Sequence, residues 1–202
     1  MLRMRVPLSL VAAFVLIALV VGVLIGGRLI HDWNAAHNSV PAGSGTNLTE
    51  LAQLESTPLN IPVLQPGDAC PVDGPLDSKG RYGLGPAYGV GASPTLNAWG
   101  AYWHVAVVIE TRVKGLVLVR GRDLKTQQPI LFGGANAYGP VDPNNPQMHA
   151  EMVVDMSSQP NLARTAELSF PVTTGLAKGY SDCVEFQIDG RGFTEHFVGG
   201  TQ

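Results

Sequence analysis

The feature that most constrains this chain is an apolar run at residues 8–27, close to the first residue. A helix rises about 1.5 Å per residue, so about 20 apolar residues span roughly 30 Å, the thickness of the hydrocarbon core of a bilayer. No charged residue interrupts the run, and no amphipathic stripe marks it as the half-buried helix of a globular domain. We therefore predict a transmembrane helix, a signal anchor, over residues 7–30.

The residues that flank the run give this helix a direction. Arg3 and Arg5 precede it with no acidic residue nearby, and Asp32 follows it. The positive-inside rule then predicts a cytoplasmic tip at residues 1–6 and an extracytoplasmic position for everything after the helix. The alternative is a signal peptide cleaved near residues 34–36, Asn-Ala-Ala, which would release a secreted protein. The run is longer than the apolar region of an ordinary signal peptide, about 7 to 15 residues, and this favours the anchor.

The composition of the external part favours strands and turns over long helices. The 202 residues include 24 Gly and 15 Pro, and only 14% are charged. All 16 acidic residues follow residue 28, together with 10 of the 13 basic residues, so this part carries a net charge of −6. A mildly acidic domain argues against nucleic acid as a partner, because nucleic acid calls for a basic patch.

The external part divides into a linker and one folded domain. Residues 31–57 are mostly small and polar, which is typical of a flexible linker. Within them, Asn47 and Glu50 have the spacing of a capping box, which predicts a short helix over residues 48–55. We expect one extracytoplasmic domain over residues 58–202, long enough to bury a substantial core.

Alternation of apolar and polar residues predicts the strands of this domain. The pattern is clearest at residues 103–110, where every second side chain is large and apolar. Further strands are predicted at residues 59–64, 115–120, 129–132, 148–156, 169–173, 183–189 and 193–198. Residues 133–146 are rich in turn formers and are expected to form an exposed loop. The pattern indicates an all-β domain, and we predict an antiparallel sandwich of immunoglobulin-like type.

Two cysteines, Cys70 and Cys183, both lie in the external part. In an oxidising compartment an even pair is most simply a disulfide, which we predict here; two buried free thiols are the alternative. Their wide separation excludes a Cys-x-x-Cys redox motif and a four-ligand zinc site.

Two segments of the domain resemble a group of uncharacterised bacterial secreted or membrane-tethered proteins. Residues 115–124, Gly-Leu-Val-Leu-Val-Arg-Gly-Arg-Asp-Leu, resemble a Gly-Pro-Val-Leu-Val-Arg-Gly segment of that group. Residues 183–194 resemble its Cys-Tyr-x-x-Gln-x-Asp-Gly-x-x-Phe-Ser end, with Val184 in place of the aromatic residue and Thr194 in place of the serine. The resemblance implies an extracytoplasmic location in a bacterium and a β domain, and it implies no activity and no catalytic residue.

Aromatic residues gather in and beside residues 82–100, a stretch rich in Gly and Pro that we expect to form an ordered loop. They are Tyr82, Tyr88, Trp99, Tyr102 and Trp103. Exposed rings of this kind stack on sugars or anchor a protein partner, which makes these five residues candidates for ligand binding. The alternative is that they cover one open end of the sandwich.

His149 and Glu151 are the candidates for a metal site or an acid–base pair. They lie two residues apart on a predicted strand and therefore face the same way. A zinc site needs a third protein ligand, which Asp155 or His104 would have to supply through the fold. The alternative is that both are solvated residues on the face of a strand.

The sequence contains no Gly-x-Ser-x-Gly nucleophile elbow and no phosphate-binding loop, so we assign no catalytic residue and no cofactor. We predict a single-pass, membrane-anchored extracytoplasmic β-sandwich module that contacts a cell-surface protein or glycan. The alternative class is an extracytoplasmic enzyme, metal-dependent through His149 and Glu151.

Overall fold

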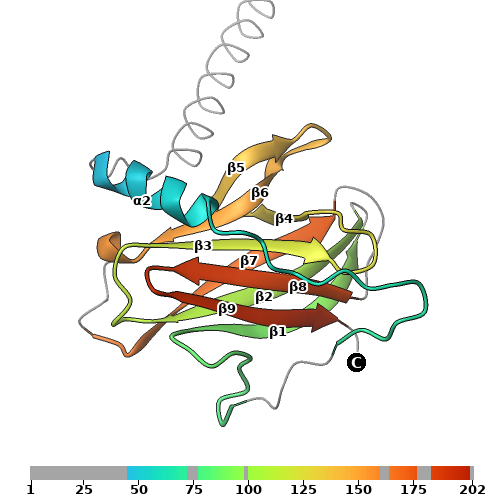
Figure 1. Cartoon of the computed structure of the whole chain (residues 1–202), viewed down its shortest axis with the longest axis horizontal. Helices are drawn as coiled ribbons and strands as arrows, with labels where there is room; N and C mark the ends of the chain where they lie inside the picture. Colours follow the sequence, from blue (N-terminus) through green and yellow to red (C-terminus); the bar gives the residue numbers. More distant parts are fainter. Residues whose placement is uncertain (1–44, 72–76, 98–99, 160–163, 177–182, 201–202) are drawn as a thin grey trace, which may run out of the picture. The chain divides into compact units, whose positions relative to one another are not determined.

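The computed structural model of the chain describes residues 45–71, 77–97, 100–159, 164–176 and 183–200 (Figure 1). The chain divides into two compact units, Met1–Ser39 and Val40–Gln202, and the described residues all belong to the second. Within these described ranges no helix is long and apolar enough to cross a membrane. The apolar run at residues 8–27 lies outside them.

Strands dominate the described residues. The one α-helix there is α2 (Gly45–Glu55), which includes the helix predicted over residues 48–55. The strands are β1 (Ala87–Asn97), β2 (Gly100–Glu110), β3 (Leu116–Asp123), β4 (Ile130–Gly133), β5 (Ala137–Asp142), β6 (Asn145–Asp155), β7 (Glu167–Leu176), β8 (Cys183–Gly190) and β9 (Phe193–Gly200). A 3-10 turn, Met156–Ser158, follows β6. The prediction of an all-β, antiparallel domain is confirmed.

The described strands form one antiparallel sheet that folds over into two halves. Their hydrogen-bonded order is β1-β2-β7-β4-β6-β3-β8-β9, and β5 pairs with the other side of β6. The halves are joined where β4 meets β6 through two residue pairs, Phe132–His149 and Gly133–Met148. The later part of β6 instead lies beside β3. In Figure 1, β3, β8 and β9 lie side by side, with α2 next to β3.

One main hydrophobic core lies between the two halves, and all nine described strands contribute buried side chains to it. The ring of Phe186 on β8 stacks on Phe197 of β9, with centroids 4.7 Å apart. The same ring meets Phe132 of β4 edge-on at 6.2 Å, although β4 and β8 are not paired strands. Each such side chain contributes about 1.5–3 kcal/mol on burial, so the core holds the halves together.

The strand order is not that of the immunoglobulin-like sandwich that the sequence predicted. Immunoglobulin domains have two separate sheets, of order A-B-E-D and C-F-G. Here one hydrogen-bonded path runs from β1 to β9, because β6 is long enough to pair first with β4 and then with β3. Alternation along a strand shows which side chains are buried, and it does not show which strand lies next to it.

Two strands lie within stretches that were predicted to be loops, residues 82–100 and 133–146. In β1, Gly89 packs under a ring of β9: a Cβ there would come within 2.7 Å of Phe197 Cδ1. Glycine in this strand therefore permits close packing and does not mark a loop. In β5, Pro140 lies on a strand whose one described partner is β6, and a missing N–H is tolerated at such an edge.

The segment at residues 59–64, predicted to be an edge strand, is not a strand in the structure. Its backbone is held at three points. The N–H of Asn60 donates to Gln187 Oε1 at 2.8 Å, and the N–H of Leu64 donates to the carbonyl of Leu124 at 3.0 Å. The carbonyl of Pro62 accepts from Gln127 Nε2 at 3.3 Å. Two of the three partners are side chains, so the segment lies against the sheet without extending it.

The predicted disulfide between Cys70 and Cys183 is present, with the two Cα atoms 5.6 Å apart. It ties the segment that follows α2 to the first residue of β8.

Reduction of this disulfide should destabilise the domain by about 5 kcal/mol, because the bond closes a loop of 113 residues and restricts the unfolded chain. The measurement is urea unfolding of the full chain in detergent with and without reductant. A Cys70→Ala/Cys183→Ala variant is the control, and its urea midpoint should be the same with and without reductant. An unchanged midpoint in the native chain, with thiol titration showing a broken bond, would contradict the prediction.

Candidate binding groove

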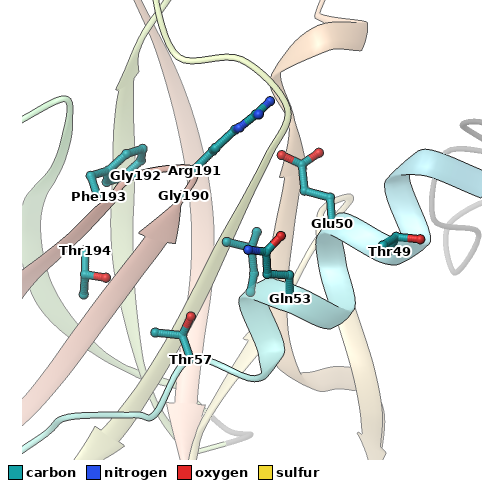
Figure 2. Close-up of a pocket in the computed structure, with 10 residues that line it drawn as sticks. Thr49, Glu50, Gln53, Thr57, Gly190, Arg191, Gly192, Phe193 and Thr194 are labelled. Carbon is teal, nitrogen blue, oxygen red and sulfur yellow. The ribbon is translucent and has the colours of Figure 1, made fainter.

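A groove lies between α2 and the turn that joins β8 to β9 (Figure 2). Its volume of about 930 Å³ falls within the range of about 300–1,000 Å³ that is typical of ligand sites. Hydroxyl, amide and charged side chains make up most of its lining. The lining residues are Thr49, Glu50, Gln53, Leu54 and Thr57 on the helix side, and Gly190, Arg191, Gly192, Phe193 and Thr194 on the hairpin side. The sequence did not predict any of these as site residues.

The hairpin wall depends on two glycines. Gly190 pairs with Phe193 across the hairpin, so Arg191 and Gly192 alone form the turn. Gly192 has a φ of 86°, in the left-handed region that favours glycine. At Gly190 an added Cβ would press into the ring of Phe193, with Cδ1 at 3.1 Å, so the ring covers this position. The turn thereby places the guanidinium group of Arg191 at this end of the groove.

The helix wall is α2, which docks on the sheet by one face. Its contact is a small hydrophobic cluster made of Leu51, Leu54, Leu116, Leu118 and Val153, with Tyr138 packed against it. Leu51 and Leu54 are three residues apart and share a face of the helix, whereas Gln53 on another face is exposed to the groove. Near the start of α2, Asn47 Nδ2 donates to Asp155 Oδ2 at 3.3 Å.

A buried hydrogen-bond network joins the two walls. Arg120 Nη2 donates to Asp189 Oδ2 at 2.7 Å and to the carbonyl of Thr57 at 2.8 Å. Gln187 Nε2 donates to Asp189 Oδ2 at 2.9 Å, and the hydroxyl of Thr194 donates to Asp189 Oδ1, also at 2.9 Å. Asp189 is only 1% exposed. We call the side chains of Arg120, Gln187, Asp189 and Thr194 the polar clamp: the Asp189 carboxylate bonds to the other three, and Arg120 also bonds to the helix side.

The polar clamp lies in two segments, residues 115–124 and 183–194. The structure places them on adjacent strands: in the β3–β8 pair Arg120 lies opposite Gln187, and Leu118 lies opposite Asp189. The sequence did carry one signal. Gln187 and Asp189 occupy alternate positions of a strand that is buried throughout its length, and buried polar groups require partners.

The structure describes the side chains of two of the five aromatic residues proposed as a ligand site. Tyr88 is buried, with its hydroxyl donating to Glu110 Oε1 at 2.7 Å and the Arg81 guanidinium 3.7 Å from its ring centroid. The hydrogen bond to Glu110, together with burial, raises the pKa of Tyr88. Tyr82 is half-buried and packs against the main core. Both rings therefore have contacts within the domain.

The other three aromatic residues are not placed as side chains. Trp99 lies outside the described residues. Tyr102 and Trp103 are described only by their backbone, which lies in β2 opposite Thr95 and Pro94 of β1. The proposal that these rings bind a sugar or a protein stays a prediction.

His149 and Glu151 lie two residues apart on β6. His149 is buried, and its Nδ1 lies 3.1 Å from the carbonyl oxygen of Gly139 on β5. Glu151 is half-buried; burial raises its pKa, and the nearby charge of Glu55 adds to the effect. Among the described residues no group of three or more His, Cys, Asp or Glu side chains could hold a metal ion, so the required third ligand is not found there.

A histidine–carboxylate pair links β8 and β9. His196 Nδ1 lies 2.9 Å from Glu185 Oε1, and the two side chains are 33% and 9% exposed. The hydrogen bond to Glu185 raises the pKa of His196 above its ordinary value of 6.5, against an opposing effect of burial. The charges of Asp189 and Glu195 act in the same direction as Glu185. Folding therefore favours the protonated imidazolium.

The fold and the groove define the described part of the chain as an antiparallel all-β domain with one docked helix. No protein-family model, no curated protein and no solved structure matches the chain. We therefore infer a function from the groove and from the contacts within the domain.

Removing the arginine of the polar clamp should destabilise the domain strongly. Arg120→Ala leaves the buried Asp189 carboxylate without its counter-charge, and we expect a loss of about 3 kcal/mol. The matched control is Arg122→Ala, an exposed arginine two residues further along β3, which should cost no more than about 0.5 kcal/mol. Both are measured by urea unfolding of the full chain, and equal losses in the two variants would contradict a buried ion pair.

The stability of the domain should fall as pH rises through the raised pKa of His196. A group whose pKa is raised by folding stabilises fully below its unfolded value, about 6.5, and this stabilisation is lost above the folded value. We expect the urea midpoint of the native chain to fall more between about pH 6 and pH 9 than that of His196→Gln. Since a third of the side chain is exposed, the difference should stay within about 1 kcal/mol. Identical pH profiles would contradict this prediction.

Proposed function

We propose that this chain is a membrane-tethered interaction module of a bacterial cell surface, which binds a ligand in the groove between α2 and the β8–β9 hairpin. The transmembrane helix proposed over residues 7–30 anchors the module, with its N-terminus in the cytoplasm and its β domain outside. The observation that carries the proposal is the groove itself, which is lined by polar side chains and held by a buried network.

Rigidity supports the binding role. A site that is already ordered loses little conformational freedom when it binds a ligand, and more of the interaction energy then appears as affinity. Here the carbonyl of Thr57, just after α2, and the hydroxyl of Thr194, on the hairpin, are held by the polar clamp. The two walls of the groove are thus fixed relative to each other before any ligand arrives.

The disulfide and the charge balance support the proposed compartment. Disulfides persist in oxidising environments such as the cell surface, and the bond between Cys70 and Cys183 closes most of the described domain. The acidic balance after residue 28 favours partners other than nucleic acid. The alternative of a metal-dependent enzyme rests on His149 and Glu151, for which the described residues supply no third ligand.

Cysteine labelling in intact bacteria tests both the location and the use of the groove. A membrane-impermeant maleimide should label Leu84→Cys, at a side chain that is 95% exposed, without permeabilisation. Met4→Cys, in the proposed cytoplasmic tip, should label only after permeabilisation. Gln53→Cys, in the groove, should label more slowly relative to Leu84→Cys in cells than in the purified full chain, because the cellular ligand covers it.

Two results would contradict the proposal. Labelling of Leu84→Cys only after permeabilisation would place the domain on the wrong side of the membrane. Equal relative labelling of Gln53→Cys in cells and in the purified chain would show that nothing occupies the groove in the envelope.

A further inference from the structure

We propose that the ligand of the groove is a neutral saccharide, an inference that rests on the proposed function and names the class of ligand. The charged residues of the described lining are Glu50 and Arg191, which have opposite signs. Figure 2 shows them on opposite walls, Glu50 on the helix and Arg191 on the turn. A groove with balanced charges gives no net attraction to a strongly acidic or basic ligand.

The hydrogen-bonding groups of the groove differ in what they offer. The hydroxyl of Thr194 donates its hydrogen to Asp189, so its oxygen faces the groove as an acceptor. Arg191 offers donors only, the carboxylate of Glu50 offers acceptors only, and the amide of Gln53 offers both. A ligand must therefore present donors and acceptors at close spacing. Sugar hydroxyls do this, because each one both donates and accepts.

The aromatic residue of the lining, Phe193, borders the groove at the hairpin. It is half-buried and packs against the main core. Neighbouring residues of a strand point to opposite faces, so its ring lies on the core face of β9, and the hydroxyl of Thr194 lies on the face that carries Asp189. Figure 2 shows Gln53 and Glu50 on the helix, across from the hairpin. The contacts offered to a ligand are therefore mainly the hydrogen bonds of polar groups on the two walls, which suits the hydroxyls of a saccharide.

The same lining fits peptide ligands less well. Strand addition needs unpaired backbone at a sheet edge, but Gly190 and Phe193 pair with each other across the hairpin. A helical peptide needs an apolar groove, and the large apolar side chains of the lining are Leu54 and Phe193, of which Leu54 is only 7% exposed. A proline-rich peptide needs several aromatic rings, and this lining has one.

The test is binding of the purified full chain, in detergent, to arrays of neutral oligosaccharides, acidic oligosaccharides and peptides. We expect binding to neutral hexose or N-acetylhexosamine chains. Arg191→Ala and Gln53→Ala should each weaken it about tenfold or more, since each removes groove hydrogen bonds. Arg122→Ala is the matched control, because Arg122 is exposed and does not line the groove, and it should bind as the native chain does.

The outcomes separate this inference from the proposed function. Binding to acidic saccharides alone or to peptides alone, or neutral-saccharide binding that Arg191→Ala and Gln53→Ala leave unchanged, would overturn the saccharide inference and leave an interaction module in place. Binding to no array together with an uncovered Gln53→Cys in cells would overturn both. Unfolding curves for each variant exclude misfolding as the cause of a loss, since both residues are exposed and lie outside the polar clamp.

Discussion

The structure of the groove depends on the hydrogen-bond partners of one buried carboxylate, that of Asp189. An unpaired carboxylate at the position of Asp189, which is 1% exposed, would cost several kcal/mol. Its partners come from three strands: Arg120 from β3, Gln187 from β8 and Thr194 from β9. Arg120 also donates to the carbonyl of Thr57, just after α2. Asp189 thus joins the three strands, and Arg120 connects this carboxylate to the chain that follows α2.

The same charge helps to specify the pairing of β8. Val184, Phe186 and Ile188 face the main core, and Gln187 and Asp189 alternate with them on the opposite face. A register slip of one residue would exchange the two faces and bury Asp189 among phenylalanine rings without a counter-charge. Buried ion pairs add little net stability compared with apolar packing, but they penalise wrong arrangements heavily. In the shifted register the carboxylate of Asp189 would carry the full penalty of an unpaired buried charge.

The sequence revealed individual strands well and their arrangement poorly. The alternation of apolar and polar residues identified most strands correctly, because it is a local signal. The presence of two cysteines in a part of the chain predicted to be extracytoplasmic identified the disulfide between Cys70 and Cys183. β1 was missed because glycines such as Gly89 were interpreted as turn formers. Gly89 is instead needed because the ring of Phe197, from a strand about a hundred residues later, packs directly on it. The groove was missed for a similar reason. Gln53 and Arg191 line one groove because α2 docks on the sheet and the polar clamp holds the residue that follows it, and no spacing along the chain reveals these contacts.

Part of the stretch that was assigned to the linker is folded into the domain. The sequence assigned residues 31–57 to a flexible linker, yet α2, from Gly45 to Glu55, docks on the sheet and forms one wall of the groove. Its apolar contact from the helix side is small, Leu51 and Leu54. The hydrogen bond from Arg120 to the carbonyl of Thr57, just after the helix, adds to this contact. The helix wall is therefore held to the sheet both by apolar packing and by the polar clamp.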